Sequence, residues 1–99
     1  MILIPLDSIK VPEGRYREEF NEGKLRDLRE GIARVGLIAP LAVEKDGDLW
    51  KLRAGERRLR ALRELYNQKQ TIRCGTADIP LGLVPCVEWD QLSSLERLE

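Results

Sequence analysis

The sequence contains no histidine, only two cysteines and no long hydrophobic run. Without histidine, the Ser–His and Cys–His catalytic pairs and the histidine-containing zinc sites are excluded. Cys74 and Cys86 have no metal-binding spacing. A disulfide between them fits the sequence, but a strand cysteine and a loop cysteine in a cytosolic protein are favoured. The apolar runs are too short to span a bilayer, so we expect no membrane segment.

The chain also lacks net charge, because 17 basic residues balance 17 acidic ones. Overall charge therefore gives no reason to expect a nucleic-acid-binding protein. The distribution is uneven, however. Six basic residues and one acid fall between Lys51 and Arg63, whereas residues 74–99 contain five acids and one base. A basic centre and an acidic end favour a local anion site over a broad nucleic-acid surface.

With 99 residues, of which 42% are apolar, the chain has the size and composition of one globular domain. Hydrophobic periodicity predicts strands at 2–4, 41–45, 49–53 and 83–89, and helices at 21–35, at 56–66 and from about 93. Residues 67–82 are polar and broken by glycine and proline, so we expect a long loop there. Pro85 indicates that the last strand lies at a sheet edge or is bulged. Because the last helix has only begun at residue 99, we expect a fragment of a longer protein.

The most unusual segment is RAGERRLRALRELY, residues 53–66, in which four arginines gather at the start of a predicted helix. Helix N-termini carry partial positive charge and usually attract acids, so these arginines indicate that an anion belongs there. On a helical wheel Arg58 lies on the apolar side with Leu62, whereas Arg57 and Arg60 lie off that side. A charged group in the position of Arg58 needs either a bound anion or a buried carboxylate.

Two interpretations of this segment follow. In the first, Gly55 lets a phosphate approach the backbone, and the free N–H groups of the first helical turn hold it together with Arg57 and Arg58. In the second, the helix is an ordinary solvated one, and Arg58 pairs with an acid such as Glu30 or Glu88. The charge pattern alone favours the second interpretation.

Two further segments are candidates for a ligand site. Arg15 and Arg17 form an arginine pair in a predicted loop, and GLIAP, residues 36–40, places a glycine between a helix and a strand. Taken alone, the arginine pair is more typical of surface charge. The glycine segment is at least as typical of a helix stop before a proline-led strand.

Three segments, RYREEF (15–20), GLIAPLAV (36–43) and LRAGERRLRALREL (52–65), together resemble the amino-terminal domain of the ParB family. The similarity is clearest over residues 2–66, and GERRLRA is its most specific motif. It implies the ParB/sulfiredoxin-like fold, an α/β (α+β) class in which a small mixed sheet packs with two to three helices. It also implies one nucleotide-binding domain over residues 1–99, with CTP and Mg²⁺ as the typical ligands. The implied nucleotide-binding residues are Arg15, Arg17, Gly36, Leu37, Ile38, Ala39, Pro40, Gly55, Glu56, Arg57, Arg58 and Arg60.

The resemblance further implies a nucleotide-binding switch domain of a cytoplasmic, nucleoid- or plasmid-associated partition protein or a phage relative. The full-length protein is then expected to be a homodimer that contacts DNA through a region beyond this chain. Any slow CTP hydrolysis is expected only in that full-length protein. Ala39 departs from the family, which usually has glutamine or histidine there. The family's metal-holding motif falls beyond residue 99, so we expect no metal ligands in this chain.

Two alternatives remain open at this point. One is a DNA-contacting module in which the Lys51–Arg63 cluster meets backbone phosphates. The other is a phosphotransferase or nuclease of the same fold, which needs a carboxylate base near the phosphates. Reductase chemistry like that of sulfiredoxin is not expected, because the GERR segment contains no cysteine. No catalytic residue is assigned.

Overall fold

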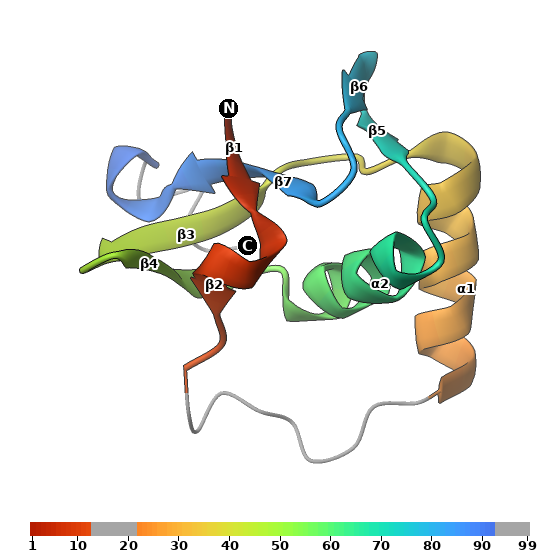
Figure 1. The fold of residues 1–99 in the computed structure, drawn as a ribbon, viewed down its shortest axis with the longest axis horizontal. Coiled ribbons are helices and arrows are strands. Elements are labelled where there is room, and N and C mark those ends of the chain that lie inside the picture. Colours follow the sequence, from red (N-terminus) through yellow and green to blue (C-terminus); the bar gives the residue numbers. More distant parts are fainter. Residues whose placement is uncertain (13–21, 93–99) are drawn as a thin grey trace.

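A computed structural model describes residues 1–12 and 22–92 as a mixed sheet, two helices and a separate two-stranded hairpin (Figure 1). The sheet has five strands in the order β1-β7-β3-β4-β2. Their bounds are β1 Ile2–Pro5, β7 Leu83–Glu88, β3 Leu41–Asp46, β4 Leu49–Ala54 and β2 Ile9–Lys10. Two neighbouring pairs, β1/β7 and β3/β4, are antiparallel, whereas β7/β3 and β4/β2 are parallel. This mixed α+β arrangement is the one that the sequence predicts.

The β3–β4 pair shows why its residues form strands. Val43 and Leu52 oppose each other across the pair and are buried, and the next pair, Glu44 and Lys51, is only half-buried. This alternation is the two-residue period of a strand with one face on the core. The register then shifts by one between Ala42 and Val43, which leaves Arg53 as the extra residue of a bulge. The bulge lies at the end of β4, directly before α2 begins.

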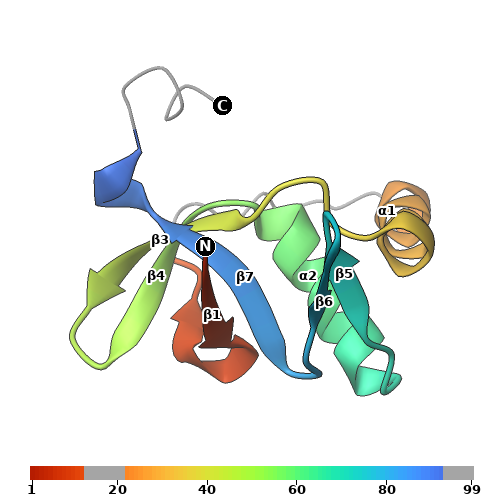
Figure 2. The ribbon, with the colours of Figure 1, turned by 90° about the horizontal axis from the view of Figure 1, so that it is seen from above.

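Two helices pack on each other and on the sheet. Helix α1 spans Glu22–Val35 and α2 spans Glu56–Asn67, close to the predicted ranges. In Figures 1 and 2, α2 lies between the sheet and α1. It buries Leu59, Leu62 and Leu65, whose helical spacing places them on one face. Such burial contributes about 1.5–3 kcal/mol per leucine side chain, which makes α2 the central element of the core.

Polar contacts fix the positions of the two helices. The Arg29 guanidinium and the Glu64 carboxylate, 2.9 Å apart, link α1 to α2. The Tyr66 hydroxyl donates a 2.6 Å hydrogen bond to the Leu83 carbonyl and ties the last turn of α2 to the start of β7. Burial raises the pKa of Tyr66 to about 12, so this hydroxyl stays protonated and able to donate.

The predicted long loop at 67–82 is wrong for residues 72–79, half of its length. Residues Ile72–Cys74 form β5 and Ala77–Ile79 form β6, an antiparallel hairpin with Gly75-Thr76 as its turn (Figure 2). Ile72 and Ile79 oppose each other and are both buried, so the hairpin is anchored in the core. The strands are short and mostly polar, and for that reason they give almost no periodicity signal.

Smaller corrections concern the rest of the chain. Strand β7 is not at the sheet edge, because it pairs with β1 on one side and β3 on the other. Pro85 pairs with β1 alone, because the pairing of β7 with β3 begins at Cys86. Cys74 and Cys86 are free thiols, and Cys74 lies in β5 rather than in a loop. The chain also has 3₁₀ turns at Leu6–Ser8 and Trp89–Gln91. The predicted helix from about 93 lies outside the described residues. Neither described helix, α1 or α2, has the length and hydropathy of a membrane span.

Candidate functional site

The two motif segments nominated by the sequence lie in contact. The loop Gly36–Pro40 connects α1 to β3, and residues 55–58 begin α2. The Nη1 of Arg58 donates a 2.8 Å hydrogen bond to the Ala39 carbonyl and has a longer contact, 3.5 Å, with the Pro40 carbonyl. One arginine on α2 therefore holds the end of the loop.

Arg58 is half-buried, and burial lowers the pKa of its guanidinium without removing the charge. Its partners are carbonyl oxygens. Within the part of the chain that the structure describes, no carboxylate pairs with it, so the predicted ion pair with Glu30 or Glu88 is wrong. A guanidinium has five N–H donors, and Nη1 carries only two of them. The remaining donors, on Nε and Nη2, are suited to a bidentate contact with an anion.

The N-terminus of α2 adds further donors. Gly55 is the N-cap residue in the left-handed conformation, with φ 108° and ψ 29°, and no side chain caps the helix. The first helical hydrogen bond runs from the Leu59 N–H to the Gly55 carbonyl, at 2.8 Å. The N–H groups of residues 56–58 precede that bond and have no acceptor within the helix. Such a terminus is the backbone arrangement that binds phosphate in many proteins.

Gly55 is also required by packing. A Cβ at this position would lie 2.7 Å from Leu41 Cγ and 3.2 Å from Arg58 Nη2. Leu41 is fully buried, so it has no open space to move into. The sequence suggested that this glycine makes room for a ligand. The structure gives it a second role, which is to let the first residue of β3 and the Arg58 head pack against the start of α2.

An apolar groove of about 230 Å³ lies beside Arg58, between α1 and the loop. The sequence did not nominate the helix residues that line it, because Leu28, Ile32 and Val35 fall on the stripe expected to face the core. Ile32 is buried as predicted, but Val35 is 62% exposed. Ile38, at the crest of the loop, is 95% exposed, which is unusual for a large aliphatic side chain. The groove has mainly apolar walls and two charged lining residues, Asp27 from α1 and Arg58 from α2. The apolar walls suit a ring, and the Arg58 side suits an anionic group.

Glu56 occupies a different environment. Its Oε1 is buried and accepts no hydrogen bond from the described residues. A small cavity of about 50 Å³ lies beside it, bordered by Val11, Pro12 and residues 52–55. That volume holds a water molecule, and an unpaired buried acceptor normally has such a partner. Glu56 is therefore an acceptor placed at the first position of α2.

The other nominated arginines are Arg15, Arg17, Arg57 and Arg60. Arg57 is exposed on α2, and Arg60 is half-buried on the same helix. Arg15 and Arg17 lie outside the described residues. No group of three or more acidic, cysteine or histidine side chains gathers into a possible metal site within residues 1–12 and 22–92.

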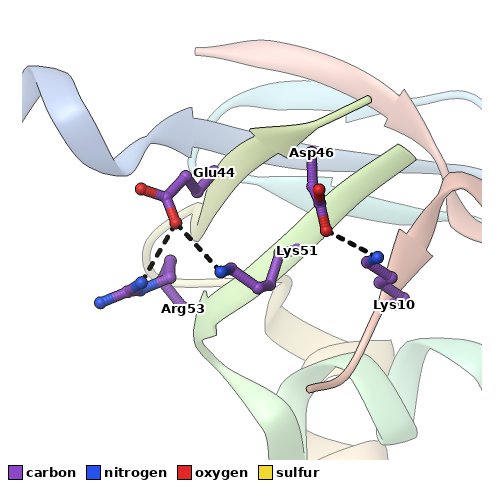
Figure 3. Close-up of polar contacts among 5 residues, drawn as sticks. All are labelled: Lys10, Glu44, Asp46, Lys51 and Arg53. Atoms are coloured by element: carbon purple, nitrogen blue, oxygen red, sulfur yellow. Dashed lines mark hydrogen bonds and ion pairs between the residues drawn. The ribbon is translucent and has the colours of Figure 1, made fainter. Parts of the chain in front are cut away.

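The basic cluster from Lys51 to Arg63 is not one surface. Lys51 and Arg53 are on β4, and both contact the Glu44 carboxylate, at 3.5 Å and 3.1 Å (Figure 3). A second pair, Lys10 and Asp46, lies nearby at 2.6 Å (Figure 3). The other arginines of the cluster belong to α2. Because acids neutralise part of the β4 charge, this arrangement weakens the interpretation as a broad DNA-backbone surface.

Comparison with known proteins shows similarity to ParB proteins. The chain matches the family model described as ParB N-terminal domain over residues 1–80. The chromosome-partitioning protein ParB of Myxococcus xanthus is 41% identical over 61 residues, 62% of this chain and 21% of that protein. The probable chromosome-partitioning protein ParB of Campylobacter jejuni is 33% identical over 100 residues, 95% of this chain and 35% of that protein. The chain thus spans about a fifth to a third of the length of these curated relatives.

Solved structures share the fold. C-terminally truncated ParB from Caulobacter crescentus, complexed to the centromeric parS site, has a TM-score of 0.71 and 25% identity over 99% of this chain and 44% of that one. The same protein complexed with CTP-γ-S has a TM-score of 0.68 and 24% identity over 98% of this chain and 47% of that one. Sulfiredoxin from Arabidopsis thaliana has a TM-score of 0.63 and 21% identity over 99% of this chain and 93% of that one. The predicted fold class is confirmed.

Proposed function

This chain belongs to the ParB N-terminal domain family, and we propose that it binds a nucleotide between the loop Gly36–Pro40 and the start of α2. The nucleotide is CTP, accompanied by Mg²⁺. In the intact protein, a homodimer in the cytoplasm, nucleotide binding switches self-association on the DNA of a nucleoid or plasmid. DNA contact belongs to regions beyond this chain.

The observation that carries this proposal is the placement of Arg58. Its half-buried guanidinium has carbonyl partners but no carboxylate among the described residues, and it lies at an uncapped helix N-terminus. A guanidinium and free backbone N–H groups at one point form a phosphate-binding arrangement. Arg57 is exposed on the same turn and adds charge to the entrance. Further nucleotide contacts in this proposal are Arg15, Arg17 and Arg60, which the family resemblance implies.

The groove beside Arg58 supports a place for the base and sugar. Its volume of about 230 Å³ accommodates a flat ring, and its lining is mainly aliphatic, with Asp27 and Arg58 as the two charged residues. Leu37 and Ile38 provide one wall from the loop. Ala39 brings no polar side chain, but its carbonyl accepts from Arg58 and so contributes to the site through the backbone.

A divalent cation fits this chain only in part. The described residues offer Glu56 at the start of α2 but no cluster of ligands. Mg²⁺ normally keeps several waters and is bound by one or two carboxylates together with substrate phosphates. The family resemblance, and not the described residues, is the reason for placing the other protein ligands beyond residue 99. When bound, the ion supplies charge neutralisation to the phosphates.

Calorimetric titration of the intact protein with CTP, ATP and GTP, each with and without Mg²⁺, tests the proposal. We expect CTP to bind most tightly and Mg²⁺ to strengthen the binding. Absence of binding by all three nucleotides overturns the proposal. A steep salt-dependent affinity for duplex DNA that nucleotide does not alter supports the DNA-backbone module instead.

Arginine variants on α2 locate the phosphates. Losing a charge-assisted hydrogen bond costs about 1.5–3 kcal/mol, so Arg58→Ala should weaken CTP binding by about ten- to a hundredfold or more. Arg58→Lys keeps the charge but loses the bidentate fork, and should recover only part of the affinity. The matched control is Arg63→Ala, an exposed arginine of the same helix outside the proposed site. Equal losses in Arg58→Ala and Arg63→Ala would show that the effect is one of general charge.

A further inference from the structure

The hairpin β5–β6 contacts the loop of the proposed nucleotide site through its backbone. The Leu37 N–H donates a 2.8 Å hydrogen bond to the Arg73 carbonyl, and the Gly75 N–H donates a 3.2 Å hydrogen bond to the Leu37 carbonyl. These two bonds form an isolated parallel bridge between Leu37 and Cys74. The loop is thus paired with a strand that does not belong to the main sheet.

The approach between loop and hairpin is close enough to require glycine. Gly36 has φ +88°, and a Cβ there would lie 2.6 Å from the Arg73 carbonyl oxygen. Real Cβ atoms are not found so near a backbone oxygen, so any side chain at Gly36 would push the loop away from β5. Gly36, the residue that follows α1, therefore also sets how near the loop lies to the hairpin.

The opposite end of the loop is held by α2. Carbonyls of Ala39 and Pro40 accept from Arg58, as described above. Leu37 is fixed by β5, and Ile38, which lies between these anchors, is 95% exposed. A loop of five residues that is anchored at both ends has little freedom to move. Its carbonyls in turn determine where the Arg58 guanidinium lies.

The hairpin is rigid enough to act as an anchor. Ile72 and Ile79 are 4% and 2% exposed and belong to the main hydrophobic core. β5 also packs against α1, the helix that leads into the loop. The hairpin tip at Gly75-Thr76 is exposed, but its base cannot shift without disturbing the core.

We propose that the hairpin β5–β6 is a positioning element of the nucleotide site, which holds the loop 36–40 in place and through its carbonyls orients Arg58. This inference rests on the proposed function. The sequence of contacts runs from Arg73 to Leu37, along the loop to Ala39, and from there to Arg58. Arg73 and Gly75 act through their backbone groups and do not touch the ligand.

The Gly36→Ala variant tests the proposal, with Gly82→Ala as its matched control. The two glycines have nearly the same backbone angle, φ +88° and φ +87°, but a Cβ at Gly82 meets no atom within 4 Å. Both variants therefore bear the strain of a left-handed alanine, and only Gly36→Ala separates the loop from β5. We expect Gly36→Ala to weaken CTP binding by about tenfold or more and Gly82→Ala to leave it unchanged. Equal affinities in the two variants overturn the proposal.

Two readouts without nucleotide distinguish positioning from general destabilisation. Amide hydrogen exchange at Leu37 and Gly75 should speed up in Gly36→Ala and not in Gly82→Ala. The Nε–H signal of Arg58 in an NMR spectrum should shift in Gly36→Ala alone. These measurements remain decisive even if the wild-type protein binds no nucleotide, a result that overturns the proposed function. An unchanged Arg58 signal overturns the positioning role.

A second pair of variants covers the case in which Gly36→Ala does not fold. Gly75→Val strains the hairpin turn at φ +61°, where a Cβ meets nothing within 4 Å. Gly47→Val strains the β3–β4 turn at φ +64°, also in open space. We expect only Gly75→Val to shift the Arg58 signal and weaken CTP binding. Equal effects of the two valines overturn the proposal.

Discussion

Gly55→Ala is expected to destabilise the fold far more than the addition of one methyl group suggests. An alanine in a sparsely populated backbone region costs about 1–3 kcal/mol. The added Cβ also meets the buried Leu41 Cγ at 2.7 Å, and overpacking of this kind costs about 1–3 kcal/mol more. The sum, about 2–6 kcal/mol, is a large fraction of the 5–15 kcal/mol by which small domains are stable.

Urea unfolding followed by the fluorescence of the two tryptophans measures this loss. Gly82→Ala is again the control, because it carries backbone strain without a collision. We expect Gly55→Ala to lower the free energy of unfolding by about 1–3 kcal/mol more than the control does, at an unchanged denaturant slope. For a domain of 99 residues, each kcal/mol corresponds to a shift of about 4–8 °C in Tm.

The collision itself is tested by a double-mutant cycle with Leu41→Ala. Leu41→Ala alone should cost about 2–5 kcal/mol, because it leaves a cavity in the core. If Leu41 Cγ is the obstacle, Gly55→Ala should cost less in the Leu41→Ala background than in the wild type. Strictly additive losses, or equal losses in Gly55→Ala and Gly82→Ala, would refute the reasoning.

Three further predictions concern stability. Tyr66→Phe should lower the free energy of unfolding by about 1–2 kcal/mol by leaving the Leu83 carbonyl unpaired. The pKa of Tyr66 in the folded protein is raised to about 12, so the stability that its hydroxyl contributes is full below about pH 10 and is lost as the pH rises to 12. Alkaline unfolding curves of the phenylalanine variant should lack this loss. Gly31→Ala should raise the unfolding free energy by about 1 kcal/mol in thermal melts, because the site is helical and a Cβ meets nothing within 4 Å. Lys10 lowers the pKa of Asp46 through a hydrogen bond, so the stability difference between wild type and Lys10→Met should be present at neutral pH and shrink below about pH 4.

The helices were predictable because their leucines repeat at helical spacing over several turns. Leu59, Leu62 and Leu65 mark the buried face of α2 without reference to any other part of the chain. The exposure of Val35 was not predictable from the same pattern. Val35 continues the stripe of α1, but it is the last residue of the helix, where the groove opens. Hydrophobic periodicity identifies the apolar face of a helix, but it does not show at which residue other elements stop packing against that face.

The partner of Arg58 shows a different limit. The helical wheel correctly indicated that this arginine lies toward the apolar side and needs a partner. A sequence offers only acids as candidate partners for an arginine, because an acid is identified by its residue type. The acceptors are main-chain carbonyls of the loop, which every residue possesses and which no residue type signals. The hairpin β5–β6 was missed for a related reason, because short polar strands are defined by their pairing rather than by their composition.

The bridge between Leu37 and Cys74 also has a consequence for the order in which the molecule assembles. The loop is synthesised before α2, but its pairing partner β5 comes after α2. Contacts between residues far apart in the sequence form late, after the entropy of closing the intervening chain has been overcome. A nascent chain that ends within α2 holds both sequence motifs and still lacks the strand that pairs with the first. Competence to bind nucleotide should therefore arise only after the hairpin docks, and not when the two motif segments alone have formed.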